Sequence, residues 1–376
     1  MPVPVPVPVP DLALSPGSGL GLGSGSGSGS GSAEHGAGAE PGSGTGTGTG
    51  VSTDLDYVLP ETAFAWKSAG GFGHAPLLRL SAPGGAQLRV AMLGEVEHPR
   101  ELQEWLVQGA RASSLLFGHF PLREALVIAV PVERSGPAFG MALRGGGPSV
   151  VILFDRHTTS AALSQDWTST HEFLHLGVPR LAPEEAWLFE GLATYYSEVT
   201  RARAGIISPR QAYQHLLDGF ERGRKNAGAL TLREESAQMR ERRSFYRVYW
   251  AGAALAFLTD VAARRAGGPT LDSALRSFAE CCAASEQACS AERVLAQLDA
   301  SLGAPHFTTQ AQRWLDRREF PELDGVLRRL GVAPGRRGAA IFGRTPEASI
   351  RDAIMARAPA SNGSPTEPQS QPQQPE

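Results

Sequence analysis

Residues 171–175 read His-Glu-Phe-Leu-His, and residues 187–191 read Trp-Leu-Phe-Glu-Gly. Side chains four positions apart share one face of a helix, so His171 and His175 can point at the same metal ion. Glu190 can supply a third ligand from a second helix. Two imidazoles and one carboxylate are typical of catalytic zinc, because three protein ligands leave the fourth position open to water. The two stretches therefore predict a site for one Zn²⁺ ion in a hydrolase.

The residues around the motif favour a metal site over a surface helix that carries two histidines by chance. Phe173 and Leu174 can pack towards a core while the histidines face the metal. Glu190 lies among apolar residues, where a carboxylate is costly unless it is paired or bound to metal. Glu184 and Glu185 are rival ligands, but they lie in the first turn of a predicted helix, where the helix dipole already accounts for acidic residues.

The residue after the first histidine is the predicted general base. Zinc lowers the pKa of a bound water, and Glu172 is placed to take its proton as the water attacks a carbonyl. Glu172 can then pass the proton to the leaving amine. Carboxylates often orient metal-bound histidines, and Glu198 is better placed for this role than Asp166. His157 and His215 have no motif around them and are predicted to be surface or capping histidines.

The two stretches resemble the catalytic core of the gluzincin metallopeptidases. They are most similar to the glycyl aminopeptidase family, whose core is like those of aminopeptidase N and the leukotriene hydrolase. Further stretches that resemble this family are residues 116–121, 245–253 and 267–276. The resemblance implies an α+β fold, in which a small β-rich N-terminal portion precedes a thermolysin-like, mostly helical zinc metallopeptidase domain. It also implies a peptide or protein substrate.

The resemblance further implies a hydroxyl group that stabilises the oxyanion formed during hydrolysis. Tyr249 matches the tyrosine of the family's Tyr-x-Lys-Gly motif. Tyr246, one helical turn earlier, is the competing choice, and core packing is the alternative role for either. The lysine of that motif is Ala251 here.

A second departure concerns the substrate's amino terminus. The acidic residue that binds the free amine in related aminopeptidases is expected near residues 145–147, which are all glycine. This departure favours a short-peptide endopeptidase or an unusual aminopeptidase. The alternatives are an inactive, zinc-binding scaffold and a zinc hydrolase that acts on a non-peptide substrate.

Composition excludes some classes of partner. The formal net charge is −3 at pH 7, with charges of both signs mixed, so no nucleic-acid partner is predicted. No segment has the length of a transmembrane helix.

Cys281, Cys282 and Cys289 are predicted to be buried or idle thiols, with one disulfide to Cys289 as the alternative. The oligomeric state stays open.

Composition also divides the chain. Residues 1–50 carry Pro-Val and Gly-Ser or Gly-Thr repeats and are predicted to be disordered. Residues 51–135 are predicted to form a small α/β portion, residues 136–330 the gluzincin-type catalytic domain, and residues 331–376 an extension that is disordered from about residue 358. Met1 leads directly into the repeats, which is not a secretory signal as written. The compartment stays open, because a misplaced start codon would allow export.

Apolar, β-branched runs predict strands at residues 77–80, 87–93, 125–130 and 149–154. The resemblance places a strand with an exposed edge before the zinc helix. Residues 149–154 are the candidate for it, and a plain core strand is the alternative. Periodicity predicts helices at residues 99–117, 160–177, 184–202, 209–224, 235–266, 271–284, 290–302 and 308–317, with 235–266 dividing near Phe245.

Overall fold

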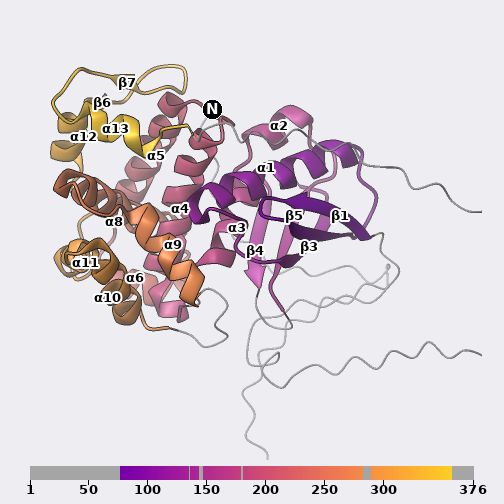
Figure 1. Ribbon diagram of the computed structural model, residues 1–376, viewed down its shortest axis with the longest axis horizontal. Helices are drawn as coiled ribbons and strands as arrows, with labels where there is room; N and C mark the ends of the chain where they lie inside the picture. Colours follow the sequence, from indigo (N-terminus) through magenta and orange to yellow (C-terminus); the bar gives the residue numbers. More distant parts are fainter. Residues whose placement is uncertain (1–76, 135, 144–146, 179–180, 283–288, 358–376) are drawn as a thin grey trace, which may run out of the picture.

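A computed structural model describes residues 77–134, 136–143, 147–178, 181–282 and 289–357. The predicted low-complexity segment and the predicted disordered tail lie outside the described residues. A small sheet forms one end of the molecule and a set of packed helices forms the other, with the two motif helices between them (Figure 1). The predicted α+β fold, with the sheet before the helices, is confirmed.

The sheet has the strand order β1-β2-β3-β5-β4. Its strands are β1 (Leu77–Ala82), β2 (Ala86–Met92), β3 (Glu124–Val132), β4 (Phe139–Leu143) and β5 (Ser149–Asp155). β2, β3 and β5 run parallel, whereas β1 and β4 pair antiparallel with their neighbours at the two edges. The four predicted strands are confirmed with shifted ends, and β4 was not predicted.

The prediction that residues 149–154 form the edge strand is wrong. β5 pairs with β3 on one side and with β4 on the other, so the core-strand alternative is confirmed. The edge belongs to β4, which pairs with β5 from Phe139–Leu153 to Leu143–Ser149. β4 reads Phe-Gly-Met-Ala-Leu and has no β-branched residue, so its sequence favours a strand only weakly.

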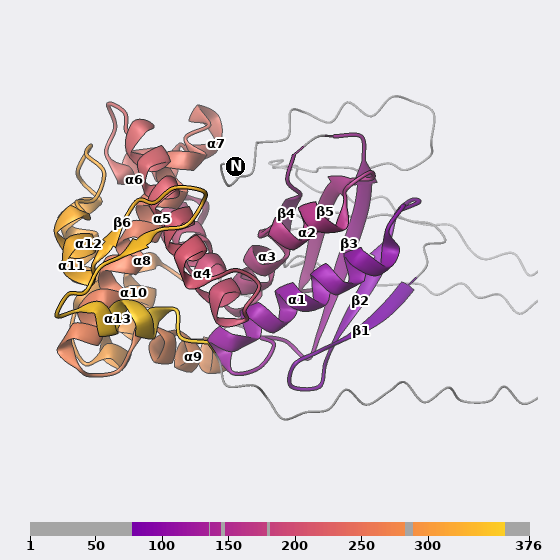
Figure 2. The ribbon, with the colours of Figure 1, turned by 90° about the horizontal axis from the view of Figure 1, so that it is seen from above.

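Three helices cover one face of the sheet (Figure 2). They are α1 (Pro99–Phe117), α2 (Ser160–Gln165) and α3 (Thr168–Gly177). Alternate residues of the strands, such as Leu88 and Val127, are fully buried and share a core with Phe173 of α3. The single helix predicted over residues 160–177 is two helices, because the backbone at Asp166 is extended.

The helical end of the molecule begins with a 3-10 turn, η2 (Pro183–Glu185). It continues with α4 (Ala186–Arg203), α5 (Pro209–Lys225), α6 (Leu232–Ala237), α7 (Met239–Arg242), α8 (Phe245–Ala266), α9 (Leu271–Cys282), α10 (Ala291–Leu302) and α11 (His306–Trp314). The predicted division near Phe245 is confirmed as the start of α8. None of the helices in the described residues is long and apolar enough to cross a membrane.

Two glycines let α4 and α8 pack closely. A methyl group on Gly252 would overlap the carbonyl oxygen of Trp187, and a methyl group on Gly191 would overlap the backbone of Gly252. Glu190 directly precedes Gly191, and Tyr249 lies about one turn before Gly252. The close approach of the two helices therefore sets the separation of Glu190 and Tyr249.

The last part of the described chain contains elements that were not predicted. They are α12 (Asp324–Leu330), the paired strands β6 (Val332–Ala333) and β7 (Ile341–Phe342), and α13 (Ala348–Ile354). The guanidinium of Arg351 joins them: it donates to the carbonyls of Leu330 and Gly343 and lies 4.3 Å from the ring centroid of Phe342. Elements this short show little periodicity. The domain boundaries at residues 135 and 330 stay predictions.

Candidate metal centre

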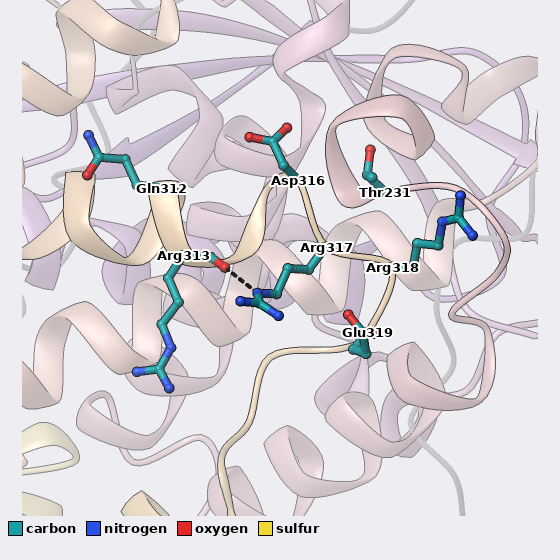
Figure 3. A pocket seen from close by; sticks show the side chains of 7 residues that line it. All are labelled: Thr231, Gln312, Arg313, Asp316, Arg317, Arg318 and Glu319. Carbon is teal, nitrogen blue, oxygen red and sulfur yellow. Dashed lines mark hydrogen bonds between the residues drawn. The ribbon is translucent and has the colours of Figure 1, made fainter.

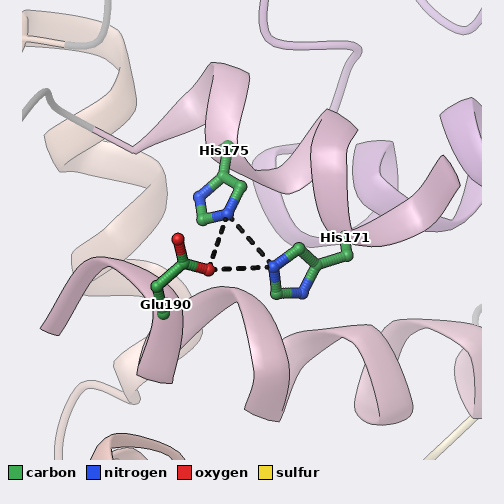
Figure 4. A group of neighbouring side chains, drawn as sticks. All are labelled: His171, His175 and Glu190. Atoms are coloured by element: carbon green, nitrogen blue, oxygen red, sulfur yellow. Dashed lines mark hydrogen bonds and ion pairs between the residues drawn. The ribbon is translucent and has the colours of Figure 1, made fainter. Parts of the chain in front are cut away.

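Two helices bring three ligand-type side chains together (Figure 4). His171 and His175 lie one turn apart on α3, and Glu190 lies near the start of α4. The Nε2 atoms of the two histidines are 3.1 Å apart. The Oε2 atom of Glu190 lies 3.2 Å from Nε2 of His171 and 3.3 Å from Nε2 of His175. Within the described residues, this is the one group of His, Cys, Asp and Glu side chains that could hold a metal ion.

The triangle of donor atoms has the size that tetrahedral zinc requires. With metal–ligand distances of about 2.0–2.1 Å and tetrahedral angles, two donor atoms lie about 3.3 Å apart. The observed separations of 3.1, 3.2 and 3.3 Å are close to this value. The side chains of His171 and His175 are 2% and 3% exposed, whereas that of Glu190 is 17% exposed. Solvent therefore reaches the group from the glutamate side.

The charges of the group also suit a cation. Burial lowers the pKa of His171 to about 4, so its imidazole is neutral at pH 7. Burial alone would raise the pKa of Glu190, but His175 and His171 outweigh this effect and hold the pKa well below its usual value. A neutral imidazole and an ionised carboxylate are the protonation states in which these groups bind metal.

A serine on α4 orients His171. The Oγ atom of Ser197 donates to the carbonyl of Ala193 at 2.6 Å and lies 3.4 Å from Nδ1 of His171. Because its own hydrogen is engaged, the hydroxyl can only accept from Nδ1–H, which leaves Nε2 of His171 free to bind a metal. Sequence reasoning missed Ser197. Its position seven residues after Glu190, on the same face of α4, is the signal that could have found it.

The carboxylates predicted to orient the histidines have other partners. Glu198 is buried, accepts from Nδ1 of His215 at 2.8 Å, and lies 3.5 Å from Nη1 of Arg201. Asp166 accepts from backbone N–H groups at the start of α3 and just before β4. The orienting role predicted for Glu198 is therefore wrong, and Asp166, the less favoured candidate, has a different role as well. His215 is neither a surface nor a capping histidine, since it is mostly buried and hydrogen-bonds the buried carboxylate of Glu198.

Aromatic rings flank both histidines. The ring of Phe189 stacks on His175 with a centroid separation of 3.9 Å and an interplanar angle of 13°. The ring of Tyr249 is nearly parallel to that of His171, at 6.2 Å and 14°, and Trp167 meets the same imidazole edge-on at 4.8 Å. These contacts restrict rotation of both imidazoles. The sequence analysis predicted a role for Glu190 but none for its neighbour Phe189.

The predicted general base lies under the edge strand. Glu172 is 5% exposed, and a methyl group on Gly140 of β4 would overlap its side chain. Burial raises the pKa of Glu172 to about 7, an effect that His175 and a hydrogen bond from the backbone N–H of Ala142 partly offset. His171, His175 and Glu190 are called the metal group below. Glu172 therefore contacts β4 on one side and adjoins the metal group on the other.

The structure distinguishes the two candidate tyrosines by position. Tyr249 hydrogen-bonds Glu190, and burial together with the charges of Glu190 and Glu172 raises the pKa of its hydroxyl well above the usual value. Its hydroxyl is therefore protonated and able to donate at neutral pH. Tyr246 and Tyr249 both pack against the helical core, and Tyr249 in addition lies beside the imidazole of His171.

Other candidate groups lie elsewhere. Glu185, a rival ligand, accepts from Nε1 of Trp187 at 2.7 Å, and Cys289 has a free thiol.

A surface pocket lies beside α6 and the end of α11 (Figure 3). Its lining is Thr231, Gln312, Arg313, Asp316, Arg317, Arg318 and Glu319. These side chains carry charges of both signs, and Asp316 is paired with Arg233.

Comparisons with known proteins agree with this geometry. Residues 167–254 match the model of a peptidase family, the M61 glycyl aminopeptidases. No curated protein matches the chain. The fold is similar to that of an aminopeptidase N family protein from Idiomarina loihiensis, with 18% identity and a TM-score of 0.56 over 69% of this chain and 50% of that one.

An M1 zinc metallopeptidase from Deinococcus radiodurans is 19% identical over 66% of this chain and 54% of that one, with a TM-score of 0.45. The chain thus spans about half the length of these two solved structures. The segment that matches the family model contains the donor triangle, Glu172 and Tyr249. The predicted resemblance is confirmed: residues 167–254 are similar to the glycyl aminopeptidase family, and the fold is similar to that of an aminopeptidase N family protein.

Proposed function

We propose that this protein is a zinc metallopeptidase that hydrolyses peptide bonds. One observation carries the proposal: the donor atoms of His171, His175 and Glu190 form a triangle of zinc-binding size, with Glu172 beside it. The match of residues 167–254 to a peptidase family supports the choice of a peptide substrate. A single Zn²⁺ ion is the expected cofactor, because the triangle leaves one tetrahedral position for water.

His171, His175 and Glu190 would hold the ion. When bound, zinc supplies a Lewis acid that polarises a carbonyl and lowers the pKa of water. Glu172 takes a proton from the water as the water oxygen attacks the carbonyl carbon, and returns it to the amine nitrogen as the C–N bond breaks. The hydroxyl of Tyr249 donates to the carbonyl oxygen while negative charge develops there.

The edge strand favours a substrate without a free amino terminus. An extended peptide can add to the open edge of β4, next to Glu172. β4 offers no acidic side chain to a protonated amine, since residues 139–143 are all apolar. The nearby carboxylates of Glu172 and Glu190 already serve as the general base and as a metal ligand in the proposed mechanism. We therefore propose short-peptide endopeptidase activity ahead of aminopeptidase activity.

Zinc content and cleavage of a peptide library, measured on the wild type and on Glu172→Gln, test the proposal. The expected result is about one zinc per chain in both proteins, with cleavage by the wild type only. Zinc without cleavage by either protein would instead support an inactive scaffold or a hydrolase of non-peptide substrates. N-acetylated and free forms of a cleaved peptide then separate the two activities, since an endopeptidase accepts both.

Tyr249→Phe tests the role of the tyrosine. Loss of a donor to the developing oxyanion should lower kcat about hundredfold with little change in zinc content. Tyr246→Phe is the matched control, because it removes a hydroxyl from the same helix one turn earlier. Equal effects of the two substitutions would contradict the assignment.

A further inference from the structure

Asp166 makes a pair of contacts that the proposed chemistry does not use. It lies between α2 and α3, directly before the helix that carries both histidines. Its Oδ1 atom accepts from the backbone N–H of Thr168 at 2.7 Å, and its Oδ2 atom accepts from the backbone N–H of Ala138 at 2.7 Å. One carboxylate therefore joins the first turn of α3 to a residue 28 positions earlier in the chain.

The same two segments are joined a second time. The hydroxyl of Thr168 donates to the carbonyl of Ala138 at 3.1 Å. Both backbone polar groups of Ala138 are thus bound to the start of α3, the N–H by Asp166 and the C=O by Thr168. We call this arrangement of Asp166, Thr168 and Ala138 the backbone clamp. Thr168 is 2% exposed and Ala138 5% exposed, so water competes little with these hydrogen bonds.

The clamp lies next to the strand that covers the general base. Ala138 directly precedes β4, whose second residue, Gly140, contacts the side chain of Glu172. Ala142, further along the same strand, donates its N–H to the Glu172 carboxylate. β4 is at the edge of the sheet and has a neighbouring strand, β5, on one side only. Its attachment to α3 therefore depends on the clamp and on the contacts with Glu172.

The main-chain carbonyl of Asp166 is also fixed, because Nε1 of Trp105 donates to it at 3.1 Å. Nη2 of Arg201 donates to the neighbouring carbonyl of Gln165 at 2.8 Å. The junction that holds β4 is thus itself anchored to α1 and α4. Because the main chain at this junction is held in place, Asp166 cannot shift to restore a hydrogen bond that Ala138 has lost.

We propose that the backbone clamp of Asp166 and Thr168 holds the start of β4 at a fixed distance from Glu172, which makes Asp166 a positioning residue for peptide binding beside that strand. The substrate part of this inference depends on the proposed function, whereas the structural part does not. Asp166 touches no reacting atom. It acts through Ala138 and β4 on the width of the space between the strand and the metal group.

Hydrogen–deuterium exchange of the full chain tests the structural part without any substrate. Asp166→Asn replaces one acceptor oxygen by an NH₂ group, which cannot accept from a backbone N–H. Asp299→Asn is a matched control: Asp299 also accepts from two backbone N–H groups, those of Phe307 and Thr308, but at the start of α11. The expected result is exchange about tenfold faster across residues 136–143 in Asp166→Asn only, the size that loss of a hydrogen bond produces.

Thr168→Val supplies a second variant if Asp166→Asn does not fold. It removes the donor to the Ala138 carbonyl and keeps the carboxylate, and Thr168→Ser, which restores a hydroxyl, should return exchange to the wild-type rate. Zinc content should stay at the wild-type level in all three variants, because no clamp residue is a ligand. Unchanged exchange of residues 136–143 in Thr168→Val, or loss of zinc together with faster exchange of α3, would overturn the proposal.

Kinetics test the part that concerns substrate. If the protein cleaves peptides, Asp166→Asn and Thr168→Val should raise KM several-fold more than they lower kcat, because the clamp positions the strand and not the reacting groups. A fall in kcat with KM unchanged would contradict the positioning role. If neither the wild type nor the variants cleave peptides while exchange behaves as expected, the proposed function fails and the clamp stands.

Discussion

The metal group and the edge strand β4 lie on two sides of Glu172, and different contacts hold them in place. The metal group is built from helices α3 and α4, whose residues have positions set by helical spacing and by close packing on α8. β4 is held by pairing with β5 and by the backbone clamp. Changes in the helices should therefore remove metal binding, whereas changes in β4 should leave metal bound and impair catalysis.

The largest effect is expected where α4 meets α8. Gly252→Ala places a methyl group against the carbonyl of Trp187, so the two helices must separate. We expect a loss of about 3 kcal/mol in the free energy of unfolding, measured by chemical denaturation. Gly268→Ala is the control, because its added methyl would have only an ordinary contact. Equal stability of the two variants would show that the close packing is not required.

The next effect concerns the metal itself. Glu190→Gln removes the ionised carboxylate. Loss of a group that only orients a metal ligand lowers metal affinity by up to about hundredfold, so loss of a ligand should lower zinc affinity by at least that much. Competition with a chromogenic chelator measures it. Glu185→Gln, which changes a neighbouring acid paired with Trp187, should bind zinc like the wild type. Similar affinities in both variants would exclude Glu190 as a ligand.

A change in β4 should impair catalysis and leave zinc binding intact. Gly140→Ala should push the strand away from Glu172 and lower kcat/KM for a cleaved peptide about hundredfold, as a displacement of about 1 Å can do. Zinc affinity should not change. Met141→Leu serves as the control, since its side chain points to the other face of the strand. Loss of zinc in Gly140→Ala would mean that strand and metal group are not separable.

The smallest effect is expected at Phe189. Phe189→Leu removes the flat ring that stacks on His175, which frees the imidazole to rotate, and zinc affinity should weaken about tenfold. Phe189→Tyr keeps the ring and should restore the affinity. A leucine variant with wild-type affinity would show that other contacts are sufficient to orient His175.

Sequence reasoning worked best where function depends on regular spacing. The four-residue spacing of His171 and His175 and the apolar residues around Glu190 are local features of two helices. Both helices form, although the first was predicted as part of one longer helix over residues 160–177. It worked less well for groups that reach across the molecule. Asp166 and Glu198 were both considered as partners of the histidines, yet their contacts are Ala138 and His215.

β4 was missed for a related reason. A short stretch with a glycine and no β-branched residue has little tendency to form a strand by itself, and its pairing with β5 creates it. The same pairing makes β5 an internal strand, although its apolar sequence is also compatible with an edge. Ser197 and Phe189 were missed because a serine and a phenylalanine within an apolar helix look like packing residues.

The amino-acid sequence alone determined the set of proposed metal ligands, the presence of the helices that carry them and the α+β class, because periodicity and ligand chemistry are local properties of the chain. Tertiary structure alone decided which strand borders Glu172, which aromatic rings fix the imidazoles and what Asp166 holds. Those outcomes depend on contacts between residues far apart in the sequence, whose hydrogen bonds and packing form only when the chain is folded.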